Sequence, residues 1–228
     1  MSNSELLPRT LSLAVHELRT PLAVSAGYIR MLLKEQAGPL NEKQMKMLTE
    51  AERACGRLGA LVSEMSELGR LESTQLALAQ QPFELHGVLT ELAADMHEGR
   101  DRGVHIEVTS DGRPLPVLGD RTRMATALGA LLHSALRERG LPGAVIADCS
   151  TSEGNGTRWG VIAIGEEGLI PALREPGQHP PAFDEWIGGL GMALPLARRV
   201  IEAHGGTIWS AADSNSRAAS GLRLPLRT

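Results

Sequence analysis

The chain has 228 residues, which is enough for one large domain or two small ones. Its formal net charge is −4 and aromatic residues make up only 3%, so neither phosphate contacts nor base stacking favours binding to nucleic acid. No apolar run approaches the roughly 20 residues that cross a bilayer and no signal-peptide pattern begins the sequence, so we expect a cytoplasmic protein without a membrane span.

Residues 5–73 are predicted to form two long helices that pack side by side. In both, apolar residues recur at alternating spacings of three and four, a pattern typical of helices packed at a shallow angle. Gly38 and Pro39 break the chain between the helices, and Asn41 and Gln44 suit a capping box at the start of the second. The seam positions are Leu11, Val15, Leu18, Leu22, Ser25, Ile29 and Leu32 in the first helix, and Leu48, Ala51, Cys55, Leu58, Val62 and Met65 in the second.

A hairpin of two such helices leaves one apolar side exposed. Each helix is about 45 Å long at the usual helical rise. A second copy of the hairpin would bury the open side by completing a four-helix bundle. We therefore expect a homodimer that forms through the helical hairpin.

The segment that begins at His16 carries the most distinctive chemistry of the chain. It places an imidazole (His16), a carboxylate (Glu17) and a hydroxyl (Thr20) within two helical turns, and Pro21 removes the amide that would bond the carbonyl of Glu17. A neutral imidazole is a nucleophile toward phosphorus, with the neighbouring carboxylate as base or orienting group. Because His16 follows Val15 at the edge of the seam, we expect it on the outside of the bundle. A surface histidine with an accidental proline would explain any one of these residues, but not the whole string.

Beyond residue 76 the pattern changes to short strand-forming runs separated by helical stretches. The change predicts a helical domain at 1–75 and an α/β domain at 76–228. Gly189 and Gly191 precede the last helical stretch, where backbone amides can approach a phosphate, although a tight packing turn explains them equally well. The predicted strands are 104–109, 144–149, 159–164 and 206–211, and the predicted helices are 84–99, 121–139 and 192–204.

The string at His16, the helical hairpin and the α/β domain together resemble the core of a two-component sensor histidine kinase. The resemblance implies a dimeric four-helix bundle followed by a histidine-kinase-type ATP-binding α/β sandwich with a mixed sheet. It also implies ATP and magnesium as cofactors and a response regulator receiver domain as partner. Further segments that fit the family pattern are Gly119-Asp120-Arg121, Glu202–Gly206 and Gly221–Leu226.

The resemblance implies a role for each polar residue in the string. His16 would be the phosphoacceptor and Glu17 would assist phosphoryl transfer from ATP. Thr20 would position the water that dephosphorylates the response regulator. A structural role for Thr20, with its hydroxyl bonded to a preceding helix carbonyl, has comparable weight.

The helix at 121–139 departs from the family pattern at the magnesium site. The family helix carries two asparagines, the second of which coordinates the ion, and those positions are Ala130 and Ser134 here. Alanine has no ligand atom, and a hydroxyl is a poor substitute for an amide oxygen at a hard cation. Arg137 keeps a positive charge where the family often has lysine, which preserves a phosphate contact. We therefore predict no intact metal site and impaired use of ATP and magnesium.

The family's adenine-reading motif, Asp-Asn-Gly-x-Gly, is also altered. The corresponding run begins at Glu166, whose carboxylate can still accept a hydrogen bond from the adenine amino group, and Gly168 follows it. Ile170 adds bulk where the family has its second glycine, and a shifted alignment leaves no acid at all. The resemblance thus implies a degenerate nucleotide site made of Ser134, Arg137, Glu166, Gly168, Gly189 and Gly191.

Three functions remain open at this stage. The first is a phosphotransfer protein that exchanges a phosphoryl group on His16 with a response regulator and uses ATP poorly. The second is an ATP-dependent autokinase, in which micromolar ATP would label His16 strongly. The third is a non-enzymatic dimer that sequesters a response regulator or a kinase, and in that case His16→Ala would leave signalling intact.

Overall fold

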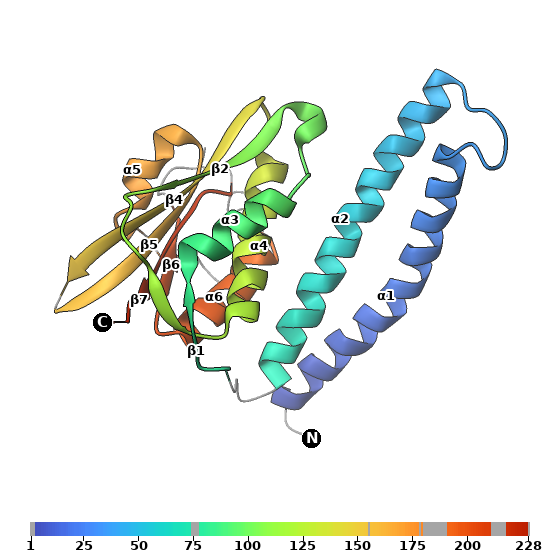
Figure 1. Cartoon of the computed structure of the whole chain (residues 1–228). Helices are drawn as coiled ribbons and strands as arrows, with labels where there is room; N and C mark the ends of the chain where they lie inside the picture. The colour runs from blue at the N-terminus through green and yellow to red at the C-terminus, as the bar shows by residue number, and fades with distance from the viewer. Residues whose placement is uncertain are drawn as a thin grey trace. The chain divides into compact units, whose positions relative to one another are not determined.

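The computed structural model describes residues 3–73, 78–154, 156–177, 179, 191–210 and 218–227. Contacts within the chain divide it into two compact units, Met1–Gln75 and Leu76–Thr228. Figure 1 shows the first unit as a helical hairpin and the second as an α/β fold. Within the described ranges, no helix combines the length and the apolar character needed to span a membrane.

The first unit consists of α1 (Asn3–Leu33) and α2 (Glu42–Ser73), which pack along one another. Asn41 and Gln44 exchange hydrogen bonds of 2.9 Å, each backbone N–H donating to the other side chain, so the predicted capping box is confirmed. α1 continues through Pro21 without a break. The hairpin buries Val15, a predicted seam residue, to 4% exposure.

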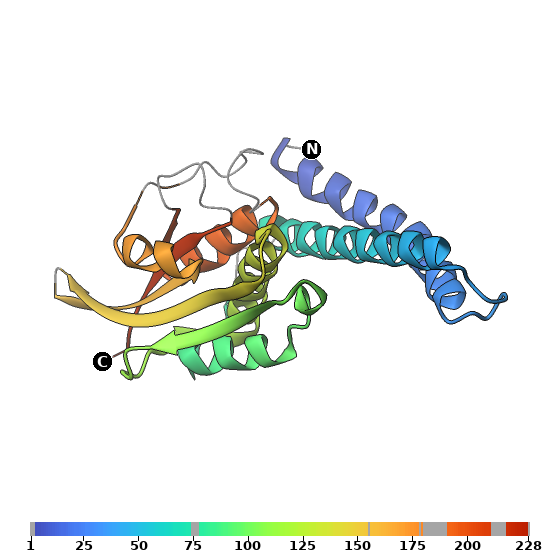
Figure 2. The same ribbon diagram turned by 90° about the horizontal axis from the view of Figure 1, so that it is seen from above.

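The second unit contains a mixed five-stranded sheet and a separate two-stranded ribbon, β1 with β3. The sheet order is β2-β4-β5-β7-β6, in which β2 is parallel to β4 and all other neighbours are antiparallel. The long β4–β5 hairpin, in yellow and gold, runs across the second unit in Figure 2. The strands are β1 (Gln81–Glu84), β2 (Val104–Ser110), β3 (Pro116–Gly119), β4 (Gly143–Gly154), β5 (Thr157–Gly165), β6 (Thr207–Trp209) and β7 (Ser220–Pro225). The helices are α3 (Leu85–Asp95), α4 (Arg121–Glu138), α5 (Ile170–Leu173) and α6 (Ala193–Ala203), with short 3₁₀ turns η1 (Arg100–Arg102) and η2 (Glu167–Leu169).

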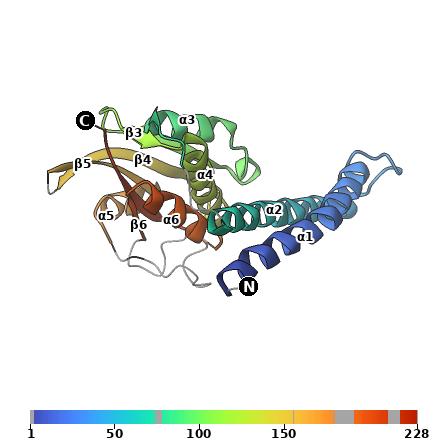
Figure 3. The same cartoon turned by 90° about the horizontal axis from the view of Figure 1, so that it is seen from below.

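Helix α4 contacts both α3 and α6 and is buried along most of its length (Figure 3). Its N-cap residue, Asp120, donates its backbone N–H to Nε2 of His204 at 2.9 Å. His204 caps the C-terminus of α6, and its Nδ1 donates to the carbonyl of Val200 at 2.7 Å. The start of α4 therefore adjoins the end of α6.

The predicted order of elements is confirmed: two long helices precede an α/β domain with a mixed sheet. The predicted helices at 121–139 and 192–204 correspond to α4 and α6 within a residue at either end. The strand expected at 144–149 is the buried part of the longer β4. This fold positions the residues of the candidate sites.

Candidate phosphoacceptor and nucleotide sites

His16 lies on α1 with its side chain in solvent. The side chain of His16 is 80% exposed and that of Glu17 is 74% exposed. Nδ1 of His16 and Oε1 of Glu17 are 4.0 Å apart, too far for a hydrogen bond but close enough for attraction when the ring carries a charge. Nε2 is the ring nitrogen remote from the carboxylate. The arrangement therefore leaves Nε2 accessible to an electrophile.

Thr20 lies on the same exposed stretch of α1. It follows His16 by four residues, and residues at that spacing occupy neighbouring positions on a helix face. Both Thr20 and Pro21 are exposed. His16, Glu17 and Thr20 are therefore close neighbours on one accessible surface of α1.

Ser134, at the predicted magnesium position, faces the interior of the second unit. It is fully buried, and its hydroxyl accepts a hydrogen bond from Nη2 of Arg137 at 3.1 Å. Ala130, one turn earlier, is 7% exposed and offers no ligand atom. Among the described residues, no group of three or more His, Cys, Asp or Glu side chains is arranged to hold a metal ion. The residues on α4 therefore do not fit Mg²⁺, which prefers several oxygen ligands.

A cluster of charges surrounds this part of α4. Nδ1 of His133 and Oε2 of Glu98 are 2.8 Å apart, and Arg102 donates to the carbonyls of Leu136 and Arg139 at the C-terminus of α4. The hydrogen bond to His133 lowers the pKa of the Glu98 carboxyl; burial opposes this effect, and the charges of His133, Arg137 and Arg102 reinforce it. The lowered pKa favours the ionised form of Glu98 beside His133.

Glu166, the predicted adenine acceptor, follows β5 and lies beside an arginine. Its Oε1 lies 3.3 Å from Nη1 of Arg139, just beyond the end of α4. At Gly165, the last residue of β5, a Cβ atom would lie 3.1 Å from Cβ of Ala219 and 3.2 Å from Cδ1 of Leu173. The end of β5 is therefore tightly packed, while the Glu166 side chain that follows it is 57% exposed beside Arg139.

Gly168 and Gly191 both have open space at the Cβ position, but only Gly191 has a left-handed backbone conformation. Gly168 lies in η2, where no atom lies within 4 Å of its Cβ position. Gly191 has a φ of +50° just before α6, and its Cβ position is equally open. Gly189 lies outside the described residues.

Of the predicted nucleotide-site residues, the structure joins Ser134 and Arg137 through their hydrogen bond on α4. Glu166 lies beside Arg139, just beyond the end of α4. Gly191 directly precedes α6, on another segment of the second unit.

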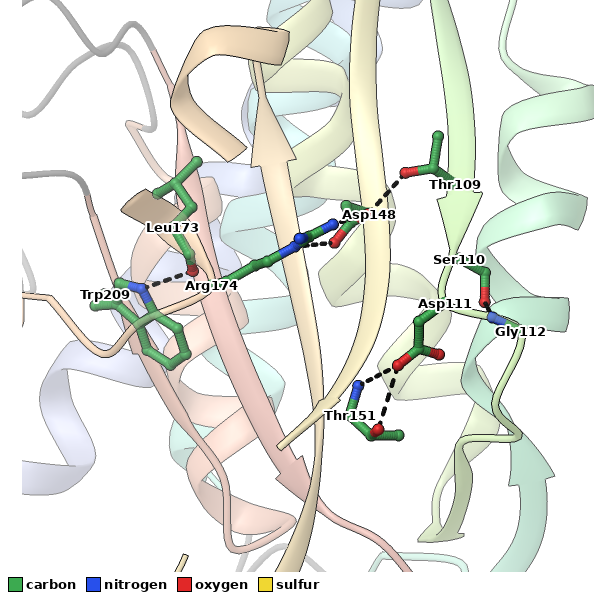
Figure 4. A network of polar contacts seen from close by, with 9 residues as sticks. All are labelled: Thr109, Ser110, Asp111, Gly112, Asp148, Thr151, Leu173, Arg174 and Trp209. Atoms are coloured by element: carbon green, nitrogen blue, oxygen red, sulfur yellow. Dashed lines mark hydrogen bonds and ion pairs between the residues drawn. The ribbon is translucent and has the colours of Figure 1, made fainter. Parts of the chain in front are cut away.

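A second polar network joins β2, β4 and the end of α5 (Figure 4). The Asp148 carboxylate is 5% exposed and accepts two hydrogen bonds from Arg174, at 2.9 and 3.0 Å, and one from the Thr109 hydroxyl at 2.8 Å. The hydrogen bond to Asp148 raises the pKa of the Arg174 guanidinium above its ordinary value. The sequence analysis missed this network. Its one signal was an aspartate inside an otherwise apolar strand, since such a residue must find a partner.

Comparison with known proteins places the first unit in a known domain family. The family described as the His Kinase A (phospho-acceptor) domain matches residues 9–74. The circadian input-output histidine kinase CikA of Synechococcus elongatus is 26% identical over 200 residues, covering 85% of this chain and 26% of the relative. The adaptive-response sensory kinase SasA of Synechococcus sp. strain CC9311 is 25% identical over 230 residues, covering 96% of this chain and 56% of the relative. The chain thus spans about a quarter to just over half the length of these relatives.

Solved structures share the fold of the whole chain. The structure of full-length ShkA in complex with AMPPNP has a TM-score of 0.61 at 20% identity and covers 97% of this chain and 46% of that one. The Acinetobacter baumannii histidine kinase AdeS has a TM-score of 0.54 at 22% identity, covering 93% and 98%. At these identities the likeness concerns the fold, a helical hairpin followed by an α/β domain.

Proposed function

We propose that this chain, the core of a two-component histidine kinase, carries a phosphoryl group on His16 and exchanges it with the receiver domain of a response regulator. The observation that carries the proposal is the exposed imidazole of His16 within a matched phosphoacceptor domain. Glu17 faces Nδ1, so Nε2 is the nitrogen that meets the partner.

The chemistry needs little from the rest of the chain. The lone pair of Nε2 attacks the phosphorus of an aspartyl phosphate, the P–Nε2 bond forms, and the bond from phosphorus to the aspartate oxygen breaks. The aspartate leaves as a carboxylate, and the reverse reaction restores it. The ring becomes positively charged as Nε2 is phosphorylated, and the carboxylate of Glu17 at 4.0 Å from Nδ1 stabilises that charge.

We also propose that ATP is a poor phosphoryl donor to this chain. Transfer from a nucleotide depends on a metal ion that bridges the phosphate oxygens. Ala130 has no ligand atom, and Ser134 is buried with its hydroxyl already bonded to Arg137. The adenine acceptor is affected as well, because Glu166 pairs with Arg139.

Phosphotransfer from a labelled receiver domain tests the first proposal. A receiver carrying ³²P on its aspartate is mixed with wild-type chain, His16→Ala or His105→Ala. His105 is the matched control because it is also an exposed histidine beside a glutamate, with its Nε2 3.0 Å from Glu107. We expect label on the wild type and on His105→Ala but none on His16→Ala. Label that persists on His16→Ala, or no label on the wild type from any receiver of the source organism, would overturn the proposal.

An autokinase is the second candidate, because Arg137 keeps a guanidinium on α4 where the resemblance implies a phosphate contact. Incubation of the wild type with micromolar [γ-³²P]ATP and Mg²⁺ separates the two. Strong labelling that is lost in His16→Ala would establish the autokinase and contradict impaired use of ATP. Labelling far weaker than that obtained from the receiver would support the first candidate.

A further inference from the structure

A groove of about 710 Å³ lies on one face of the five-stranded sheet, between β2 and the segment that follows β5. Every second residue of β2 and β4 lines it, so these side chains share one face of the sheet. η2 and α5 supply the opposite wall. The lining residues of the two strands are Glu107, Thr109, Ala144, Ile146 and Asp148.

The strand register gives the width of this groove. Glu107 is opposite Ile146 of β4, and Ile146 is opposite Gly165 of β5. Glu107 and Gly165 are therefore two strand spacings apart, about 10 Å. Glu167 lies two residues beyond Gly165 and lines the same groove. Carboxylates thus occur on both walls, while Ala144 and Ile146 give the floor an apolar character.

The two arginines of the groove each have a carboxylate of their own. Arg174 donates two hydrogen bonds to Asp148 (Figure 4). Nε and Nη1 of Arg139 are buried and have no hydrogen-bond acceptor among the described residues, so Glu166, 3.3 Å from Nη1, is the charge that compensates this guanidinium. The charged residues that line the groove are Glu107, Asp148, Glu166, Glu167, Arg139 and Arg174. The carboxylates of Glu107 and Glu167 are therefore the surplus.

The charges next to the groove do not remove this surplus. Arg102 donates to the backbone carbonyl of Arg139, and the charge of Asp111 helps to raise the pKa of Arg174. Nε2 of His105 lies 3.0 Å from Oε1 of Glu107, whose side chain is 54% exposed. A carboxylate has about four acceptor positions, so this one contact leaves Glu107 able to bind a further donor.

We propose that this groove binds an arginine side chain from an extended segment of a partner protein. The aliphatic part of an arginine packs on apolar surface, and its planar guanidinium matches carboxylates with two hydrogen bonds each. Ala144 and Ile146 supply the apolar surface, and Glu107 and Glu167 supply the acceptors on either side. The same surplus of negative charge disfavours a ligand that carries phosphate.

The form of the groove suits a protein segment better than a small molecule. Sites for small molecules are mostly apolar and enclose the ligand, whereas carboxylates on both walls here are exposed to solvent. From Ala144 to Asp148 the groove extends about 13 Å along β4, the length of about four extended residues. β2 is the edge strand of the sheet, so a partner chain reaches the groove without crossing another strand.

Fluorescence anisotropy of the full chain with a labelled peptide tests this inference. The probe is a five-residue peptide of threonines with one central arginine, labelled with fluorescein. We expect Glu107→Gln and Glu167→Gln each to weaken binding about tenfold, because each removes a charged acceptor. Glu153→Gln is the matched control and should bind like the wild type, since Glu153 is exposed opposite Arg158 at the far end of the β4–β5 hairpin. Thermal melting verifies that each variant is folded.

The peptide supplies a second control. Citrulline in place of its arginine keeps the shape of the side chain without the charge and should weaken binding tenfold or more. Equal binding of the citrulline peptide, wild-type affinity in both glutamate variants, or no binding of the arginine peptide would overturn the inference. Free arginine amide that binds as tightly as the peptide would indicate a small-molecule site, and displacement of the peptide by ATP would assign the groove to the nucleotide; either result also contradicts it.

This test is separate from phosphotransfer. All residues that line the groove belong to the second unit, whereas His16 belongs to the first. A failure of peptide binding therefore leaves transfer from a receiver to His16 untouched, and a failed transfer leaves the anisotropy measurement untouched.

Discussion

Asp120 joins the start of α4 to two other segments. Its Oδ1 accepts the backbone N–H of Arg123 at 3.0 Å, and its Oδ2 accepts that of Ala79 at 3.4 Å. Its own backbone N–H donates to His204. Burial acts to raise the pKa of the Asp120 carboxyl, but the two amides and the charge of Arg123 lower it overall. The ionised carboxylate is therefore the form that stabilises the fold.

This depressed pKa predicts a loss of stability in acid. The stabilisation is present above the unfolded-state value of 3.8 and is lost as the pH falls through the lower folded-state pKa. Asp120→Asn keeps a capping oxygen but cannot titrate. Measured by circular dichroism from about pH 5 to about pH 3, the melting temperature should fall more steeply for the wild type than for the variant. Parallel curves would show that the carboxylate charge contributes nothing.

At the residue scale, the sequence predicts a site when its members are close along the chain. His16 and Glu17 are adjacent, and helical spacing alone puts Thr20 beside them. The pairs Asp148–Arg174 and Arg139–Glu166 instead join residues that are more than twenty positions apart. Only the folded sheet brings these charges together, so the engagement of Glu166 by Arg139 was beyond sequence reasoning.

At the element scale, α5 is held against the sheet by both apolar and polar contacts. Ile170 and Leu173 pack in a buried cluster with Ile146, Ala163 and Ala219. The indole Nε1 of Trp209 donates to the carbonyl of Leu173 at 3.1 Å, and Arg174 follows at once with its two bonds to Asp148. A helix of one turn cannot persist alone, so these contacts determine its place.

Removing Arg174 should therefore cost more than the loss of a surface charge. In Arg174→Gln the Asp148 carboxylate stays buried without its cation. We expect this change to lower the free energy of unfolding by about 2 kcal/mol. The loss is smaller than for a fully buried pair because the Arg174 side chain is half exposed. Adding Asp148→Asn should recover part of this loss, because the stranded charge is gone. Urea denaturation of the two single variants and the double variant measures the coupling. Additive losses would mean that the pair contributes no coupling energy.

The turn between β3 and α4 depends on a glycine. A Cβ atom at Gly119 would lie 2.2 Å from Cδ2 of His204, so Gly119→Ala must displace the ring that accepts from Asp120. We expect a loss of about 1–3 kcal/mol in the free energy of unfolding. Gly87→Ala, in α3 with nothing within 4 Å of its Cβ position, is the control and should be neutral or slightly stabilising. Equal effects in a thermal or urea titration would contradict the packing argument.

The length of an element decides whether its pattern can be recognised. α4 has 18 residues and α2 has 32, enough for several helical periods. β1, β3 and α5 have four residues each, so they contain too few repeats to differ from loops. β4 extends well beyond its apolar run because its polar C-terminal half pairs with β5, a partner that the local sequence does not reveal.

At the scale of the whole molecule, the hairpin exposes apolar residues that its sequence assigns to a seam. Leu18 is 48% exposed on α1 and Leu58 is 52% exposed on α2. Between the helices runs a groove lined by small and apolar residues, among them Leu22, Ala26 and Gly59. Such a surface on an isolated hairpin favours association with a second copy, which completes a four-helix bundle.

A charge placed in that seam should separate the two copies. In a two-fold dimer each substitution occurs twice, so Leu58→Glu removes two buried leucine side chains, worth about 3 kcal/mol or more in total. That loss corresponds to a dissociation constant weaker by on the order of a hundredfold. Met47→Glu is the matched control, because Met47 is 64% exposed on the same helix and lies outside the seam pattern. At one concentration, sedimentation velocity should show a dimer for the wild type and for Met47→Glu, and a monomer for Leu58→Glu. A monomeric wild type, or a Leu58→Glu variant that stays dimeric, would show that the seam does not join two chains.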